Sequence, residues 1–218
     1  MAELRTNNVC YRYKRADRNV LNDVSCAFEA GAITAIVGPS GSGKTTLLSI
    51  LAGLDRPTGG QVFIGDDDLA GLDLDQYRRE RISLIFQAFH LFPLLSALEN
   101  VSYPMEMNGV ARKDAEARAK ELLLSVRVTE DKHKRYPGNL SGGEQQRVAI
   151  ARALSTGARV LLADEPTGNL DAENGEVVLG VLKNLAHDEG YCVIVVTHNP
   201  EIAEASDVVY RMKDGVLG

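Results

Sequence analysis

The chain has 218 residues, of which 44% are hydrophobic and 25% are charged, and its formal net charge is −6. This composition is that of an ordinary globular protein and excludes an intrinsically disordered chain. The acidic balance argues against a protein that wraps nucleic acid or lies on anionic lipid. The longest apolar runs, 32–37 and 192–196, are far shorter than the roughly 18 residues of a membrane span. We therefore expect a cytosolic chain of one or two domains with no membrane span.

The three cysteines, Cys10, Cys26 and Cys192, are an odd number and show no CxxC spacing. This pattern predicts reduced thiols in or near strands rather than a disulfide framework or a zinc site.

The first third of the chain has the pattern of strands. Residues 20–28 alternate between apolar and polar, which is typical of a half-buried strand. The continuous apolar run 32–37 instead indicates a strand buried on both faces, as in a parallel sheet covered by helices. A leucine-rich helix is expected over 45–54 and a short strand over 61–64.

The middle of the chain, about 88–154, is expected to be a mostly helical insertion. Residues 111–126 consist of good helix formers, with apolar residues at three- and four-residue steps. The spacing predicts an amphipathic helix with one apolar face.

The last third alternates between strand and helix. Apolar runs predict strands at 159–163, 191–197 and 208–212, and a helical face lies around 177–185. Asn199 can cap a further short helix. This alternation predicts an α/β fold with a parallel sheet and right-handed crossovers.

A glycine-rich turn follows the apolar run 32–37. It matches the pattern G-x-x-x-x-G-K-[ST] and consists of Gly38, Pro39, Ser40, Gly41, Ser42, Gly43, Lys44 and Thr45. The glycines allow successive backbone N–H groups to point at a phosphate, and the following helix adds its positive end. Lys44 can reach the β- and γ-phosphates, the Thr45 hydroxyl can bind Mg²⁺, and Thr46 is a further candidate phosphate contact. The alternative, an ordinary Gly-Ser loop before a helix, does not explain lysine and threonine in this register.

Two acidic residues follow the apolar strand 159–163. A nucleoside triphosphate site needs a carboxylate for Mg²⁺ at the end of a strand near the phosphate loop, and Asp164 fits this role. Because adjacent side chains on a strand alternate between faces, Glu165 would point elsewhere and could orient the attacking water. A solvated acidic pair at a strand exit is the alternative, and the phosphate loop favours the Mg²⁺ site.

The segment that distinguishes among phosphate-loop families is 140–147, with the sequence LSGGEQQR. Ser141 and Glu144 form an S-x-x-E capping box for a helix that runs to about residue 154. Gly142 and Gly143 cost roughly 1 kcal/mol each relative to alanine, so they make sense if another group must approach the backbone closely. A helix N-terminus with bare glycines and a hydroxyl is a second candidate anion site. Spacing alone leaves open whether both sites serve one nucleotide.

This signature segment, 140–147, resembles the signature motif of ATP-binding cassette (ABC) proteins. Gln87 resembles the glutamine of that family's Q-loop, 169–171 resembles the D-loop, and His198 resembles the switch histidine. The resemblance covers essentially the whole chain. Tyr13 is the better candidate for the aromatic residue that stacks on adenine, with Tyr11 as the second.

The resemblance implies a P-loop NTPase fold of the α/β class, with a RecA-like core, an antiparallel β subdomain and a helical subdomain. The chain would be a single ATP-binding domain, 1–218. About 1–87 and 155–218 would form the core with the β subdomain, and about 88–154 the helical subdomain that carries the signature segment.

The resemblance also implies a head-to-tail dimer that encloses two ATP molecules. Each ATP would lie between the phosphate loop of one chain and the signature segment of the other. Ser141 and Gly143 would contact the γ-phosphate of the ATP held by the partner chain, with Gly142 and Glu144 beside them in the same site. Asp171 would communicate across the dimer.

The catalytic residues implied by the resemblance are Glu165, His198, Gln87 and Lys44. Gln87 would approach Mg²⁺ and the attacking water and would link hydrolysis to the helical subdomain, while His198 would hold the γ-phosphate. The implied Mg²⁺ ligands are Thr45, Gln87 and Asp164.

Two further stretches suggest a subgroup. DEPTGNLD at 164–171 and LSALENV at 95–101 are similar to the cassettes of lipoprotein release and macrolide export. That similarity implies an ATPase that docks on a permease on a separate chain, at the cytoplasmic face of the membrane, and transmits force to it. The alternatives are a regulatory cell-division cassette that moves no solute, an importer ATPase, a soluble cassette of translation or DNA repair, and a small-molecule kinase. The signature segment argues against the kinase, and the acidic charge argues against a nucleic-acid partner.

Overall fold

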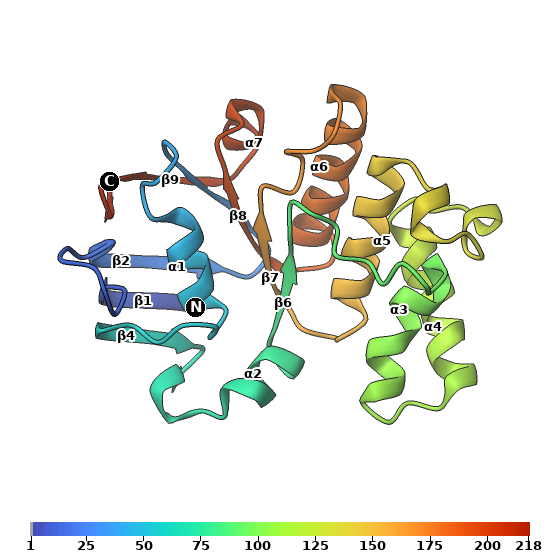
Figure 1. The fold of residues 1–218 in the computed structure, drawn as a ribbon, viewed down its shortest axis with the longest axis horizontal. Helices are drawn as coiled ribbons and strands as arrows, with labels where there is room; N and C mark the ends of the chain where they lie inside the picture. Colours follow the sequence, from blue (N-terminus) through green and yellow to red (C-terminus); the bar gives the residue numbers. More distant parts are fainter. Residues whose placement is uncertain (1) are drawn as a thin grey trace. The chain divides into compact units, whose positions relative to one another are not determined.

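The computed structural model describes residues 2–218, which form two compact units (Figure 1). The core unit consists of the chain up to residue 84, 159–165 and 182–218, and the helical unit consists of 85–158 and 166–181. Residues 85–87, 155–158 and 166–181, which were expected in the core, group with the helical unit in the structure. The predicted combination of a parallel sheet, an antiparallel sheet and a helical segment is confirmed.

A six-stranded sheet forms the centre of the core unit. In order across the sheet, its strands are β10 (Val216–Leu217), β9 (Val208–Lys213), β3 (Ile33–Val37), β8 (Cys192–Thr197), β7 (Val160–Asp164) and β6 (Ile82–Ile85). Strands β9, β3, β8 and β7 are parallel neighbours. All six residues of β8 are buried, as the continuous apolar run predicted. Because Val37 lies opposite Thr197, and Asp164 opposite Val196, the carboxyl ends of β3, β8 and β7 meet at one edge.

A second, antiparallel sheet belongs to the same unit. Its strand order is β2 (Leu21–Glu29), β1 (Ala2–Tyr11), β4 (Gly59–Ile64) and β5 (Asp67–Asp68). In β2 the side chains alternate between buried and exposed, so one face of the sheet is apolar. That face shares a hydrophobic core with the central sheet and with helix α1 (Lys44–Leu51). The three cysteines are free thiols on strands, as expected.

Two shorter helices complete the core unit, α2 (Leu74–Glu80) and α7 (Pro200–Glu204). The predicted cap of α7 is confirmed, because the side chain of Asn199 accepts a hydrogen bond from the amide of Glu201. Helix α2 was not predicted. Its Tyr77 is fully buried and donates a hydrogen bond of 2.7 Å to the carbonyl of Leu51, which anchors a short and mostly charged helix.

The helical unit contains α3 (Ala97–Met107), α4 (Arg112–Ser125), α5 (Gly142–Leu154) and the first part of α6 (Ala172–His187). Helices α3, α4 and α5 pack against one another (Figure 1). Short 3₁₀ turns, η2 (Glu130–Lys132) and η3 (Pro137–Asn139), lead into α5. Within residues 2–218, no helix combines the length and the apolar character needed to cross a membrane.

Candidate nucleotide site

The phosphate loop connects β3 to α1, as predicted. Gly43 has a φ of 107°, which a residue with a side chain rarely adopts, and it is the N-cap of α1. At Gly38 a Cβ atom would lie 2.1 Å from the carbonyl oxygen of Met212, so only glycine fits. The Lys44 ammonium donates to the carbonyl oxygens of Gly38 and Pro39, at 2.8 and 3.0 Å, and so lies across the loop. The buried Ser42 hydroxyl has no hydrogen-bond partner among the described residues, which fits a cradle whose acceptor is a ligand.

The two oxygen ligands predicted for Mg²⁺ in the core unit lie together. Burial and the negative charge of Glu165 raise the pKa of Asp164, while Lys44 and a hydrogen bond from the Thr45 side chain oppose this rise. A bound cation would relieve the cost of keeping this carboxylate ionised. The described residues include no group of three or more His, Cys, Asp or Glu that could hold a metal. A single carboxylate bonded by a threonine hydroxyl suits Mg²⁺ bound with a nucleotide, because such an ion takes one or two carboxylates together with phosphate oxygens and water.

Glu165 and His198 are hydrogen-bonded to each other across the ends of β7 and β8. Glu165 has a φ of 47°, which turns the chain sharply after β7 while its amide still donates to the carbonyl of Val196. The Glu165 carboxylate lies 2.7 Å from Nδ1 of His198 and accepts from the Thr197 hydroxyl at 3.0 Å. A non-glycine residue in this conformation is uncommon and marks a place where function can require it. Two of the four predicted catalytic residues, Glu165 and His198, are therefore paired at the sheet edge.

The structure distinguishes between the two tyrosines proposed for adenine stacking. Tyr11 is 8% exposed and belongs to the core, whereas Tyr13 is 48% exposed. Their rings meet edge to face with centroids 5.0 Å apart. The Tyr13 hydroxyl lies 3.0 Å from Oγ1 of Thr46, in the first turn of α1. Tyr13 thus presents an open ring beside the phosphate loop, with its edge supported by Tyr11.

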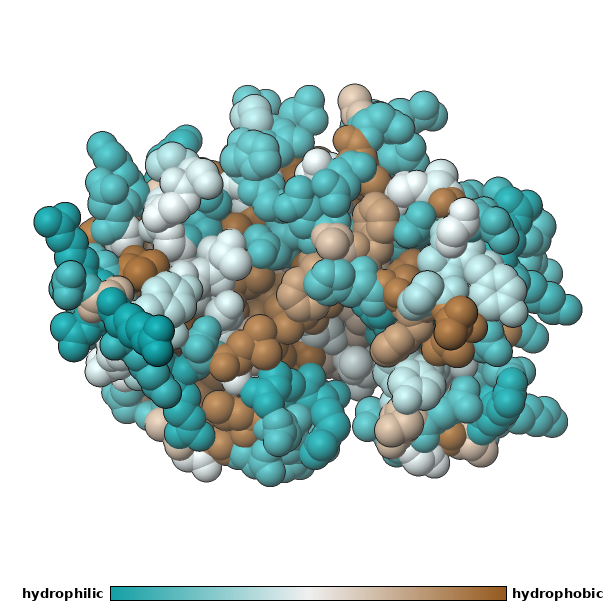
Figure 2. All heavy atoms as spheres, viewed as in Figure 1, coloured by the Kyte–Doolittle hydropathy of each residue, from teal (hydrophilic) through white to brown (hydrophobic). Residues whose placement is uncertain are grey.

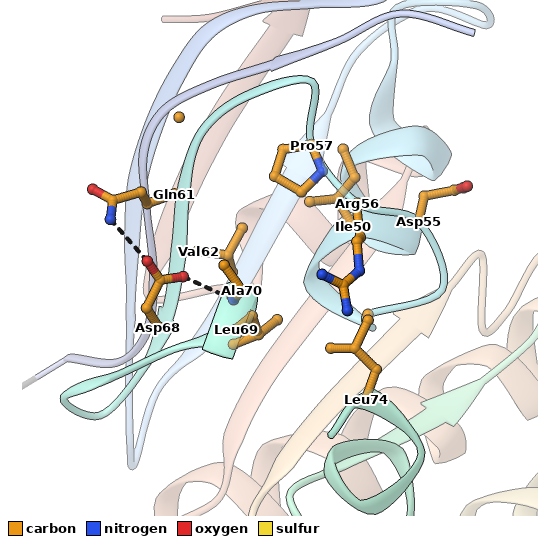
Figure 3. A pocket seen from close by; sticks show the side chains of 12 residues that line it. Ile50, Asp55, Arg56, Pro57, Gln61, Val62, Asp68, Leu69, Ala70 and Leu74 are labelled. Carbon is orange, nitrogen blue, oxygen red and sulfur yellow. Dashed lines mark hydrogen bonds between the residues drawn. The ribbon is translucent and has the colours of Figure 1, made fainter. Parts of the chain in front are cut away.

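A separate cavity of about 190 Å³ lies in the core unit between the end of α1, β4 and α2. Figure 3 shows Gln61 bonded to Asp68 on one side of it, and the Arg56 guanidinium directed toward Leu74 on the other. None of its lining residues belongs to the phosphate loop. A larger open hollow of about 580 Å³ is lined by Gly38, Pro39 and His198, among others, and this hollow adjoins the candidate site.

In the helical unit, the signature segment begins α5 with the predicted capping box. The amide of Ser141 donates to the Glu144 carboxylate at 2.8 Å, and the amide of Glu144 donates to the Ser141 hydroxyl at 3.3 Å. Burial acts to raise the pKa of Glu144, but the Ser141 amide and the Lys132 ammonium, 3.0 Å away, lower it overall. The helix N-terminus is therefore held in place by its own segment.

The Q-loop and D-loop residues also meet within the helical unit. Nε2 of Gln87 donates to Oδ1 of Asn169 at 3.2 Å, and Nδ2 of Asn169 donates to the carbonyl of Gln87 at 3.0 Å. Asp171 begins α6, where its carboxylate accepts from the backbone amide and the side-chain amide of Asn174. These bonds lower the pKa of Asp171.

Sequence reasoning missed the supporting roles of three residues in this unit. Asn169 holds Gln87, and Asn174 holds Asp171. Arg152, on α5, donates to the carbonyl oxygens of His90 and Phe89, at 2.6 and 3.2 Å, and so fastens the segment after Gln87. No local pattern marks such residues, since two of the three act on groups more than 60 positions away.

Comparisons with known proteins agree on one family. The family model for ABC transporters matches residues 21–168. The macrolide export ATP-binding/permease protein MacB of Salmonella typhi is 46% identical over 215 residues, which are 96% of this chain and 33% of that protein. MacB of Escherichia coli (strain K12) is 47% identical over 201 residues, which are 91% of this chain and 31% of that protein. The chain thus spans about a third of the length of these relatives.

Solved structures give the same result for the fold. The dimeric structure of MJ0796, a bacterial ABC transporter cassette, has a TM-score of 0.88 and 39% identity, and covers 98% of this chain and 96% of that chain. The same cassette is also known as a dimer in a post-hydrolysis state bound to ADP and Pi. The cbiO1 protein of Clostridium perfringens has a TM-score of 0.91 and 26% identity, with coverage of 100% and 87%.

Proposed function

The chain belongs to the family of ABC transporters, and from this premise we propose that it binds ATP and hydrolyses it to ADP and phosphate to power a membrane permease. The observation that carries the proposal is the edge where β3, β7 and β8 end. The phosphate loop, the Asp164 carboxylate and the Glu165–His198 pair all lie there, within the core unit. These are the groups that phosphoryl transfer to water requires.

Hydrolysis would depend mainly on positioning and on charge. The phosphate loop and Lys44 would hold the β- and γ-phosphates. The Lys44 ammonium, which donates to two loop carbonyls in the structure, would donate to these phosphates instead. Thr45, Asp164 and Gln87 would hold Mg²⁺, which supplies neutralisation of the charge that develops on the phosphate oxygens. Glu165 would orient the attacking water, and His198 would release the Glu165 carboxylate to hold the γ-phosphate. Tyr13 would stack on adenine, because Tyr11 is buried.

We further propose that the active form is a head-to-tail dimer. The N-terminus of α5, with Ser141 and Gly143, would bind the γ-phosphate of the ATP held by the partner chain. A related cassette is known as a dimer, which supports this assignment. ATP would then link the two chains by its charge, and hydrolysis would remove that link.

The permease would be of the export or force-transmission type, on a separate chain, with this ATPase at the cytoplasmic face of the membrane. The names of the curated relatives include macrolide export and a permease. The helical unit exposes large apolar side chains, which Figure 2 shows among hydrophilic ones. The exposed large apolar residues of this unit are Phe92, Leu94, Tyr103, Met107, Val110, Leu124 and Tyr136, and Leu94 is 86% exposed. Of these, Phe92 and Tyr103 lie together, with ring centroids 5.5 Å apart, and this part of the unit, with Leu94, would receive the permease.

The test is an assay of phosphate release by the purified chain with ATP and Mg²⁺. Lys44→Ala should abolish hydrolysis and ATP binding, whereas Lys120→Ala, at an exposed position of α4, should leave both unchanged. Leu94→Glu should retain the ATPase activity of the isolated chain and lose stimulation by a co-expressed permease. Hydrolysis by the Lys44→Ala variant at the wild-type rate would refute the proposal.

A further inference from the structure

One side chain, Asn174, connects the D-loop to the signature segment inside the helical unit. Its Nδ2 donates to both carboxylate oxygens of Asp171, each at 3.0 Å, and its backbone amide donates to the same carboxylate at 2.8 Å. The side chain is half-buried, and the residue on its other side is Gly143, which is buried. The same residue thus bonds to the D-loop aspartate and lies against the first turn of α5.

The fit between Asn174 and Gly143 leaves no room for a side chain at position 143. A Cβ atom there would lie 2.1 Å from Oδ1, 2.5 Å from Cγ and 2.9 Å from Cβ of Asn174. A Cβ atom at the neighbouring Gly142 would meet nothing nearer than 3.5 Å, which is ordinary van der Waals contact. The group that approaches the backbone of the second glycine therefore lies within the same chain.

We propose that Asn174 is a positioning residue for ATP hydrolysis. It fixes the position of Asp171 relative to the N-terminus of α5, so that both can contact the partner chain at the same time. This inference rests on the proposed dimer. Asn174 itself would touch neither ATP nor Mg²⁺. Its absence should therefore change the rate at which the dimer hydrolyses ATP and not the affinity of one chain for ATP.

A purely structural role as a helix cap makes a different prediction. The cap of α6 consists of the Asp171 carboxylate and the backbone amide of Asn174, and it survives replacement of the side chain. Asn174→Ala would then change little. Under the positioning role, the same variant loses both Nδ2 bonds and the contact with Gly143, so only the backbone amide of residue 174 still restrains Asp171.

The first experiment measures ATP binding and steady-state hydrolysis in wild type and in Asn174→Ala. We expect the Kd for ATP of the isolated chain to stay within about twofold, while kcat falls about ten- to a hundredfold, the effect of a small misplacement of catalytic groups. The isosteric variant Asn174→Asp fills the same space but sets a carboxylate against Asp171. Because two like charges raise the pKa of the pair, its kcat relative to wild type should recover as the pH is lowered from 7 to 5. A helix cap alone would not produce that pH dependence.

The second experiment is a thermal double-mutant cycle in the nucleotide-free chain. Gly143→Ala should lower Tm, because the new methyl group displaces Asn174, whereas Gly142→Ala should leave Tm unchanged or raise it. Combining Gly143→Ala with Asn174→Ala should restore part of the lost Tm, since the second change makes room for the first.

Wild-type kcat in Asn174→Ala, or strict additivity of the two changes in Tm, would overturn the inference. Absence of hydrolysis in the wild-type chain would instead refute the proposed function, and the thermal cycle would still report on the contact.

Discussion

Replacing Glu165 by glutamine is the sharpest test of the catalytic assignment, because glutamine keeps the shape while it removes the charge and turns one acceptor oxygen into a donor. In the structure the carboxylate accepts from the Thr197 hydroxyl and lies 2.7 Å from Nδ1 of His198. A glutamine oxygen can still accept from His198, and its amide can donate to the Thr197 hydroxyl. The variant should therefore lose about 1 kcal/mol of charge-assisted bonding, which corresponds to roughly 2–4 °C in Tm for a chain of this length.

The effect on hydrolysis should be far larger. A positioned base contributes about 10²–10⁴-fold to a rate, or roughly 3–5 kcal/mol of activation free energy. Binding of ATP should be retained, because the phosphate loop does not contain Glu165. With binding intact and hydrolysis blocked, Glu165→Gln should accumulate as a dimer with ATP, measured by light scattering on a sizing column together with phosphate release.

Glu189→Gln, at an exposed glutamate of the same unit, is the matched control and should behave as wild type. If Glu165→Gln releases phosphate at the wild-type rate, Glu165 does not orient the water. If its Tm falls by more than about 10 °C, the loss of activity would reflect unfolding. The glutamine amide would then not replace the carboxylate in its bonds to His198 and Thr197.

Three further changes test other parts of the core unit. Tyr13→Ala should raise the KM for ATP several-fold while Tyr13→Phe should not, in steady-state assays; an equal effect of both would exclude stacking. Gly38→Ala should cost about 1–3 kcal/mol in thermal or denaturant unfolding, because the new Cβ atom would overlap the carbonyl of Met212. The bond from His187 lowers the pKa of Asp207 below its usual 3.8. The bond therefore stabilises the fold above pH 3.8, and this stabilisation is lost as the pH falls through the lowered pKa. Asp207→Asn should therefore lower stability at pH 7 by about 1 kcal/mol, since the pair is partly exposed, and the difference should vanish near pH 2; an equal difference at both pH values would contradict this account.

The central sheet could be predicted because its strands carry their own signal. The runs at β3 and β8 are continuously apolar, and a phosphate loop with its lysine and threonine follows the first of them. In contrast, α2 is rich in charge, and it is held near the end of α1 by the buried Tyr77 and by a bond from Arg78 to the carbonyl of Gly53. Its existence depends on a tertiary contact that no periodicity reports. Ser96 and Glu99 form the capping box of α3, an S-x-x-E pattern that is visible in the sequence and marks where this helix begins.

The site residues could be predicted from their type and their order in the sequence. The residues that hold them in place by hydrogen bonds could not. Asp164 and Glu165 follow a strand, and this position alone indicates a site. The bond between Glu165 and His198 joins residues 33 positions apart and depends on the pairing of β7 with β8. Asn169 and Asn174 look like ordinary polar residues of a loop and a helix, and only the fold places them against Gln87 and Asp171.

The division of the chain into two units corresponds to a division of chemical tasks. The core unit contains the phosphate loop, Asp164 and the Glu165–His198 pair, and Gln87 is the one proposed contributor to the ATP site of its own chain that belongs to the helical unit. The helical unit contains the signature segment and the D-loop, which are proposed to face the ATP of the partner. Each set is organised by hydrogen bonds within its own unit: Lys44 to its loop in one, and Asn174 to Asp171 in the other. A chain built in this way can keep both half-sites in order before any partner arrives, so that the proposed dimerisation would bring together two surfaces that are already formed. The entropy lost when these groups are ordered is then part of folding and does not weaken binding. Under that condition, one nucleotide of modest size could join two chains, and its hydrolysis could release them.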